Sequence, residues 1–164
     1  MMDQAQDRLK VLVPVDFSEP ARRALAWAFD YAARAPCELH LLHVVEDHLG
    51  DSLSGLARQR MAAELGAIAA AAEAELERML PDPEERAAVP VVRHVTHGKP
   101  APEILRIADK LGAEMIVMGA HGRSGLDRLL IGSVAEKIVR GARCPVVCVK
   151  PGPGRGASGS SASR

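Results

Sequence analysis

Five short apolar runs alternate with longer segments of helical period, and this alternation constrains the fold more than any other feature of the chain. The runs that indicate strands cover residues 10–15, 38–45, 89–96, 114–119 and 145–150. The segments of helical period between them cover residues 18–34, 54–80, 101–111 and 133–141. A β-α order repeated in this way predicts an α/β fold, in which helices cover both faces of one parallel sheet of five strands.

Local signals set the ends of several of these helices. Ser18 is a suitable N-cap, and Pro20 is tolerated in the first turn that follows it. Gly112 and Gly141 are expected to stop the third and fourth helices. In the long second helix, apolar residues recur at spacings of three and four and so define one helix face: Met61, Leu65, Ile68, Ala72, Leu76 and Met79.

The chain length and the C-terminal composition indicate one domain with a tail. The 164 residues suit a single domain, which we place at residues 1–150. Residues 151–164, PGPGRGASGSSASR, contain no apolar side chain larger than alanine. Such a segment cannot bury enough surface to offset the entropy of ordering, so we expect a disordered tail.

Charge and cysteine content narrow the function classes. Lys plus Arg and Asp plus Glu both number 21, so charge gives no reason to expect nucleic acid or an acidic membrane as the partner. Three cysteines without a CxxC pair indicate reduced thiols rather than a disulfide framework or a zinc site. With no signal peptide and no apolar run of about 20 residues, the expected location is the cytoplasm.

Two loops at strand ends are the candidate binding site. PVDFS (14–18) follows the first strand, and the glycine-rich GAHGRSGLDRLLIGS (119–133) follows the fourth. With a sheet order of 3-2-1-4-5, both loops line the crevice where strand order reverses, which is where such sheets bind ligands. Glycines there allow positive φ and close approach of a ligand, and backbone N–H groups before a helix bind phosphate. In the alternative reading, Gly119 only ends a strand and Ser133 only caps a helix, in a capping box with Glu136.

The spacing of the glycines is more specific than their number. Gly119, Gly122, Gly132 and Ser133 fit the pattern G-x2-G-x9-G-[ST]. This pattern, together with VLVPVDFSEPARRALAWA, LHLLHV and the whole of residues 97–150, resembles the universal stress protein family. The resemblance extends over about residues 8–150 and implies a Rossmann-like fold with five parallel strands.

The resemblance also implies an ATP site, a regulatory or sensing role in stress, and a homodimer. Adenosine would face Pro14, Val15 and Asp16, with Asp16 near the ribose or a phosphate-bound Mg²⁺, and Val44 would contact adenine. Met118 and Gly119 would lie under the ribose. The residues expected around the phosphates are Gly122, Gly132, Ser133, Val134 and Ala135, with His121 and Arg123 also within reach.

Two other functions remain open from the sequence. A slow ATP hydrolase is one, although no general base is evident and turnover is expected far below about 10 per second. A dimeric interaction protein that binds no nucleotide is the other. The chain has no Walker A motif, so it is not a P-loop ATPase, and the absence of GxGxxG after the first strand disfavours a dinucleotide dehydrogenase.

The remaining reactive side chains have simpler explanations. The six histidines match no metal-ligand spacing, and Cys144 and Cys148 are expected to be apolar strand residues. The strand 145–150 is the expected sheet edge. Antiparallel pairing of this edge with its copy would give a two-fold dimer.

Overall fold

The structure is a computed structural model, which describes residues 8–46, 55–120 and 131–150, without the side chains of 55–61 and Glu85. The five strands are β1 (Leu9–Pro14), β2 (Cys37–Glu46), β3 (Val91–Gly98), β4 (Met115–Gly119) and β5 (Val146–Val149). The helices are α1 (Glu19–Ala32), α2 (Gly55–Arg78), α3 (Pro83–Arg86), α4 (Pro100–Leu111) and α5 (Ser133–Gly141). The expected disordered tail, residues 151–164, lies outside the described residues.

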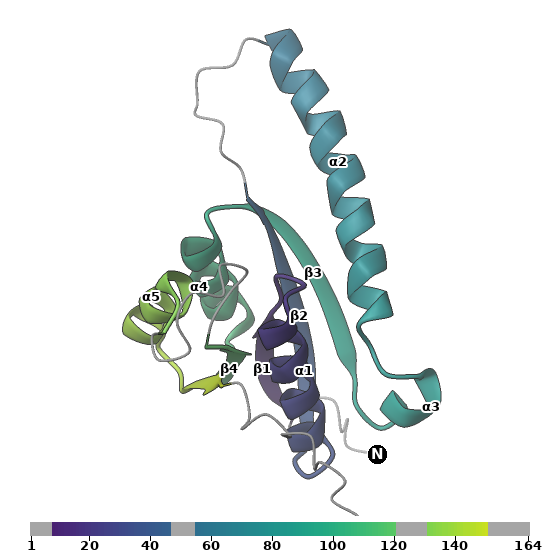
Figure 1. Ribbon diagram of the computed structural model, residues 1–164, viewed down its shortest axis with the longest axis vertical. Coiled ribbons are helices and arrows are strands. Elements are labelled where there is room, and N and C mark those ends of the chain that lie inside the picture. Colours follow the sequence, from purple (N-terminus) through teal and green to yellow (C-terminus); the bar gives the residue numbers. More distant parts are fainter. Residues whose placement is uncertain (1–7, 47–54, 121–130, 151–164) are drawn as a thin grey trace, which may run out of the picture.

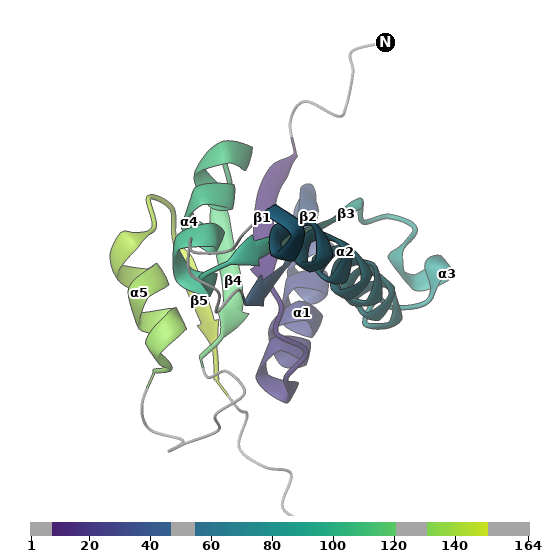
Figure 2. The same ribbon diagram turned by 90° about the horizontal axis from the view of Figure 1, so that it is seen from above.

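The strands form one parallel sheet in the order β3-β2-β1-β4-β5, which confirms both the predicted fold class and the predicted order. Figures 1 and 2 show α1 and α2 on one face of the sheet and α4 and α5 on the other. Each face has its own core. Val11 and Val13 of β1 pack with α1 and α2, whereas Leu12 between them packs with α4 and α5. Because successive side chains point to opposite faces and both faces are covered, β1 is buried from Val11 to Pro14, and only its first two residues are exposed.

The ends of the helices follow local chemistry. Ser18 is the N-cap of α1, and its hydroxyl accepts a hydrogen bond from the Ala21 N–H at 3.3 Å. Gly112 ends α4 in the left-handed conformation, with φ +63°, which glycine adopts without steric cost. Two details were not predicted: α3 is an additional short helix, and β3 extends to Gly98.

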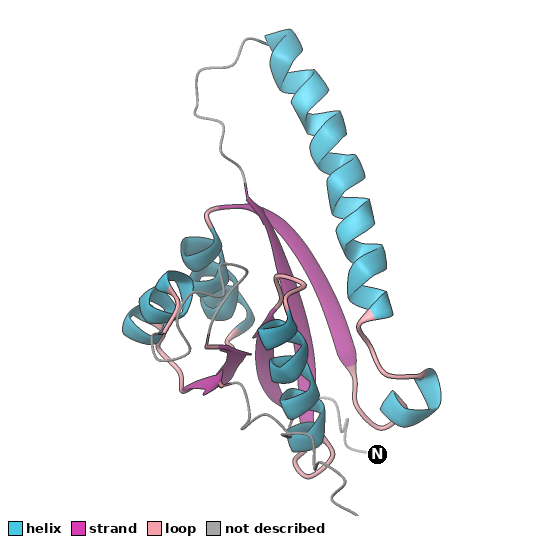
Figure 3. Ribbon diagram, in the orientation of Figure 1, coloured by secondary structure: helices cyan, strands magenta, loops and turns pink. Residues whose placement is uncertain are grey.

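The apolar face of α2 divides into two halves. Ala72 and Leu76 are buried against the sheet, whereas Ile68 is 48% exposed. Figures 1 and 3 show that the N-terminal half of α2 extends beyond the end of the sheet, and Ile68 lies within one turn of that half. Among the described residues, no helix is long and apolar enough to cross a membrane.

Candidate functional site

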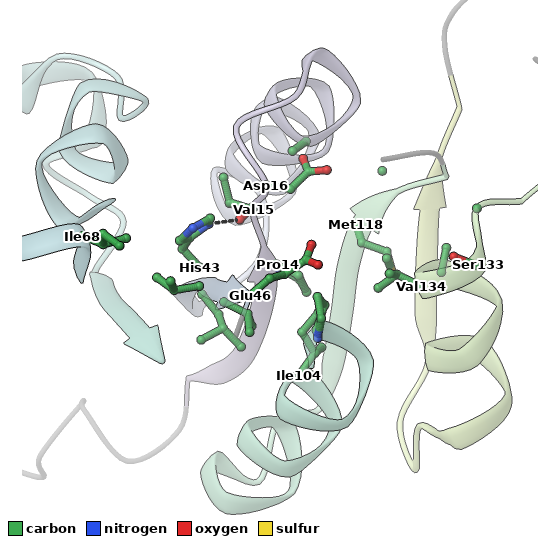
Figure 4. A pocket seen from close by; sticks show the side chains of 18 residues that line it. Pro14, Val15, Asp16, His43, Glu46, Ile68, Ile104, Met118, Ser133 and Val134 are labelled. Atoms are coloured by element: carbon green, nitrogen blue, oxygen red, sulfur yellow. Dashed lines mark hydrogen bonds between the residues drawn. The ribbon is translucent and has the colours of Figure 1, made fainter. Parts of the chain in front are cut away.

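One pocket of about 610 Å³ lies at the carboxyl ends of the central strands (Figure 4), within the size range of ligand sites. It brings together predicted site residues that are far apart in the sequence: Pro14, Val15, Asp16, Val44, Met118, Gly119, Gly132, Ser133, Val134 and Ala135. The predicted His121, Gly122 and Arg123 lie outside the described residues.

The loop after β1 is fixed to the start of α1. The Asp16 Oδ1 atom accepts hydrogen bonds from the backbone N–H of Ser18, at 3.1 Å, and from the Ser18 hydroxyl. Ser18 in turn caps α1. Asp16 therefore stabilises the start of α1, and it also lines the pocket.

The end of β2 presents backbone groups to the pocket. Alternate residues of a parallel strand direct their N–H and C=O groups to opposite neighbours. Leu42 faces β1, because its carbonyl accepts from the Val15 N–H at 2.8 Å. Val44 faces the same way, but β1 has already ended at Pro14, opposite Leu42. Among the described residues, the Val44 N–H makes no hydrogen bond to the Val15 carbonyl, which is the acceptor that continued pairing along β1 would offer. The N–H donor and the C=O acceptor of Val44 thus lie side by side at the pocket wall.

The two ends of the glycine-rich stretch lie together at the pocket. The Gly132 N–H donates to the Ala120 carbonyl at 2.8 Å, and the Ala120 N–H donates to the Val149 carbonyl at 3.0 Å. The first helical bond of α5 runs from the Glu136 N–H to the Gly132 carbonyl. The N–H groups of the three residues between, 133–135, have no acceptor among the described residues, and all three residues line the pocket.

The capping-box reading of Ser133 is wrong. Gly132 is the N-cap of α5, and Ser133 is the first helical residue, exposed at the rim of the pocket. Only a side chain at the N-cap position can accept from the N–H of the third helical residue, and Ser133 lies one residue beyond that position.

Positive φ does not explain why glycine occupies the two motif positions that the structure describes, Gly119 and Gly132. Among the described glycines, only Gly98 and Gly112 have positive φ, and Gly132 has an ordinary φ of −62°. At Gly119 the reason is close packing. A Cβ atom there would lie 2.8 Å from the Pro20 Cβ atom and 2.9 Å from the Pro20 carbonyl carbon.

Several pocket residues were not predicted from the sequence: Ala21, Leu42, His43, Val45, Glu46, Ile68, Pro100 and Ile104. Most belong to segments whose apolar period identifies them only as core.

Pro100 and Ile104 are on α4, whose first turn is fixed to β3 by a hydrogen bond from the Thr96 hydroxyl to Glu103 at 3.1 Å. Hydrogen bonds from Arg106, and then from Thr96, lower the pKa of the Glu103 carboxyl and keep this acceptor ionised.

A second cluster, away from the pocket, pairs two histidines of adjacent strands. His40 Nδ1 on β2 lies 2.9 Å from His94 Nε2 on β3. His40 Nε2 lies 3.0 Å from a Glu38 oxygen, although the pair lacks hydrogen-bond geometry. Within the described ranges, no group of three His, Cys, Asp or Glu side chains is placed to hold a metal ion.

The sequence model of the Universal stress protein family matches residues 8–150. The chain belongs to the universal stress protein family.

Relatives and solved structures agree with this assignment. Universal stress protein MJ0531 of Methanocaldococcus jannaschii is 32% identical over 141 residues, which cover 86% of this chain and 81% of that protein. The structure of the universal stress protein UspA from Lactobacillus plantarum superposes with a TM-score of 0.75 at 26% identity, covering 87% of this chain and 97% of that one.

A further universal stress protein, solved in complex with cAMP, shares the fold with a TM-score of 0.58 at 22% identity, covering 86% of this chain and 95% of that one. Three mycobacterial relatives are longer than this universal stress protein, which matches 45% of their length.

Proposed function

We propose that this universal stress protein binds ATP in the pocket at the carboxyl ends of β1, β2 and β4. One observation carries the proposal: the pocket joins three kinds of group that ATP needs. These are the backbone N–H and C=O groups of Val44, the apolar surface of Met118, and the N–H groups at the start of α5, which have no acceptor in the described part of the chain. The solved cAMP complex of a family member supports an adenine nucleotide as the ligand class.

Each part of the nucleotide has a matching partner in this arrangement. The Val44 N–H and C=O groups suit the acceptor and the amino group along one edge of adenine. Guanine presents the opposite order of donor and acceptor there. The ribose lies over Met118 and Gly119. The phosphates face the N–H groups of residues 133–135, where the helix dipole favours negative charge.

A magnesium ion would be bound together with the phosphates. Asp16 lines the pocket, and a carboxylate oxygen is a ligand that Mg²⁺ accepts. Because the described residues hold no preformed group of three metal-binding side chains, phosphate oxygens would complete the coordination. The role of Asp16 is then to orient the phosphate end of the ligand.

The biological role we propose is that of a cytoplasmic regulator or sensor in a stress response, active as a homodimer. The dimer forms through the edge strand β5, which carries a row of apolar side chains of intermediate exposure. Slow ATP hydrolysis and nucleotide-independent partner binding are the competing functions, and the experiment below separates the second of them from ATP binding.

Thermal unfolding with and without Mg-ATP, after removal and identification of any co-purified nucleotide, tests the proposal. At a hundredfold excess over Kd, binding stabilises the folded state by about 2.7 kcal/mol. For a chain of this size we expect the melting temperature to rise by about 5–11 °C. An unchanged melting temperature in millimolar Mg-ATP would favour the interaction protein, and a time course of phosphate release reports hydrolysis separately.

A pair of variants on α5 locates the phosphates. Ser133→Asp adds a negative charge beside the proposed phosphate site, and aspartate in a first turn does not weaken the helix. We expect ATP affinity to fall by about tenfold or more from charge repulsion. Lys137→Gln changes the net charge equally at an exposed position that does not line the pocket, and it serves as the control. Equal affinities of the two variants would exclude phosphate binding at this helix end.

A further inference from the structure

Phe17, in the loop after β1, has an unusual backbone conformation. Its φ is +63°, and it is the only positive φ at a non-glycine among the described residues. A bulky side chain in this region costs about 1–3 kcal/mol and persists only where its surroundings hold it. Phe17 directly follows Asp16, so the same surroundings hold the pocket carboxylate.

His43 of β2 supplies that support through two contacts. Its ring lies against the Phe17 ring, with centroids 4.4 Å apart and planes inclined by 32°. Its Nδ1 atom lies 2.8 Å from the Val15 carbonyl oxygen, as the dashed line in Figure 4 shows. A carbonyl only accepts, so Nδ1 carries the proton and donates it. His43 therefore contacts the residues on both sides of Asp16.

The Val15 carbonyl is the group that would continue the β1–β2 ladder. In a parallel pair, the rung after Val15 N–H to Leu42 C=O runs from the Val44 N–H to the Val15 C=O. The His43 ring occupies this acceptor instead. The ladder stops one rung early, and the Val44 N–H remains directed at the pocket.

We infer that His43 is a positioning residue for base recognition: by binding the Val15 carbonyl and packing on Phe17, it keeps the Val44 N–H available to the ligand. This inference rests on the proposed nucleotide site. A histidine that merely filled the core would need no particular acceptor. Here the acceptor is the Val15 carbonyl, and its hydrogen bond with His43 ends the β1–β2 ladder at the pocket.

Two substitutions separate the two contacts of His43. His43→Asn keeps an N–H group close to the position of Nδ1 but removes the ring. His43→Phe keeps a ring against Phe17 but removes the donor, so the Val15 carbonyl can recapture the Val44 N–H. Leu76→Ala, in the core under α2, is the stability control because Leu76 is fully buried and does not line the pocket.

The readout is the affinity for ATP compared with that for tripolyphosphate, which lacks the base. We expect His43→Phe to weaken ATP binding by about tenfold, the value of one hydrogen bond of about 1.4 kcal/mol. Tripolyphosphate affinity should stay within about twofold. His43→Asn should lose less ATP affinity than His43→Phe, and Leu76→Ala should change neither affinity. Equal losses for ATP and tripolyphosphate in His43→Phe, or no loss of ATP affinity, would overturn the inference.

A measurement without ligand separates this inference from the proposed function. Ring ¹⁵N chemical shifts of His43 should place its proton on Nδ1, and amide exchange at Val44 should slow in His43→Phe as the rung closes. A proton on Nε2, or unchanged Val44 exchange, would overturn the positioning role even where ATP binds. Absence of ATP binding by the unmodified protein would instead overturn the proposed function.

Discussion

Gly119 shows how a single missing Cβ atom sets the contact between β4 and α1. The atoms nearest to a Cβ at this position include the Pro20 carbonyl carbon and oxygen, at 2.9 and 3.0 Å, so a side chain rotation cannot relieve the contact. Gly119→Ala should therefore displace the start of α1 and lower the free energy of unfolding by about 1–3 kcal/mol. Thermal or urea unfolding measures this loss.

Gly66→Ala is the matched control for that change. Gly66 is exposed inside α2, and nothing lies within 4 Å of the position of its Cβ. The same substitution should there raise the free energy of unfolding by about 0.5–1 kcal/mol, because alanine is the better helix former. A stabilised Gly119→Ala variant would contradict the steric explanation.

The sequence predicted which backbone segments lie at the pocket, but it did not predict a pocket side chain with an unusual partner. The motif and the family resemblance placed residues 132–135 at the site, and all four line the pocket, because a helix start at a strand end can be predicted from the sequence. His43 was weighed only as a possible metal ligand and was set aside with the other histidines. Its position in an apolar run gives no sign of the carbonyl that it binds. That partner exists only once the end of β1 is placed beside β2.

The paired strands β2 and β3 hold the acid-sensitive part of the fold. Burial is the main cause that lowers the pKa of both His40 and His94 below the usual 6.5. Glu38 opposes this effect on both rings, whereas Lys10 adds to it at His40 and Lys110 adds to it at His94. Both rings therefore resist protonation more strongly in the folded state than in the unfolded chain.

The sign of the pH dependence follows from that difference. Above about pH 6.5 the histidines are neutral in both states, and their contribution to stability is complete. As the pH falls below about 6.5, the unfolded chain takes up protons that the folded state resists, so the free energy of unfolding decreases. Urea unfolding between pH 7.5 and 5 should show this decrease.

The double variant His40→Leu/His94→Leu should flatten that pH profile, because it removes both rings. His97→Gln, at an exposed position on the same strand, should leave the profile as it is. A profile that keeps its slope in the double variant would assign the acid sensitivity to other groups.

Helix α2 shows what an apolar period can and cannot predict. The spacing of its apolar residues correctly identified the face that packs on the sheet at Ala72 and Leu76. The same spacing continues to Ile68, which is half-exposed and lines the pocket instead of packing in the core. The spacing of apolar residues identifies one face of a helix, but how far the sheet covers that face depends on the lengths of the strands beneath it.

At the scale of the whole molecule, the predicted strand order proved correct because few topologies satisfy the constraints of a β-α repeat. Right-handed crossovers and helices on both faces place the first strand at the centre. The same topology leaves β5 at an edge. The carbonyls of Pro145 and Val149 accept hydrogen bonds from the β4 side of the sheet. Because alternate residues of a strand face opposite neighbours, the backbone groups of Val146 and Cys148 face outward from the sheet edge.

This geometry gives a test of the proposed homodimer. Val146→Pro removes one outward N–H and should shift the protein from twice the 17.5 kDa chain mass to the single-chain mass at micromolar concentration. Val146→Thr retains the N–H and should remain dimeric. Light scattering of both variants measures the effect, and a single-chain mass for the unmodified protein would exclude the dimer.

The contact between Gly119 and Pro20 also affects how family signatures are interpreted. A relative that has lost its ligand is released from selection on the pocket but still has to pack its first helix against its fourth strand. Purifying selection at position 119 would then persist after the ligand is gone. If ATP binds as proposed, the first glycine of the signature would mark descent in the fold, and divergence at the helix that begins at Ser133 would be the better marker of lost binding.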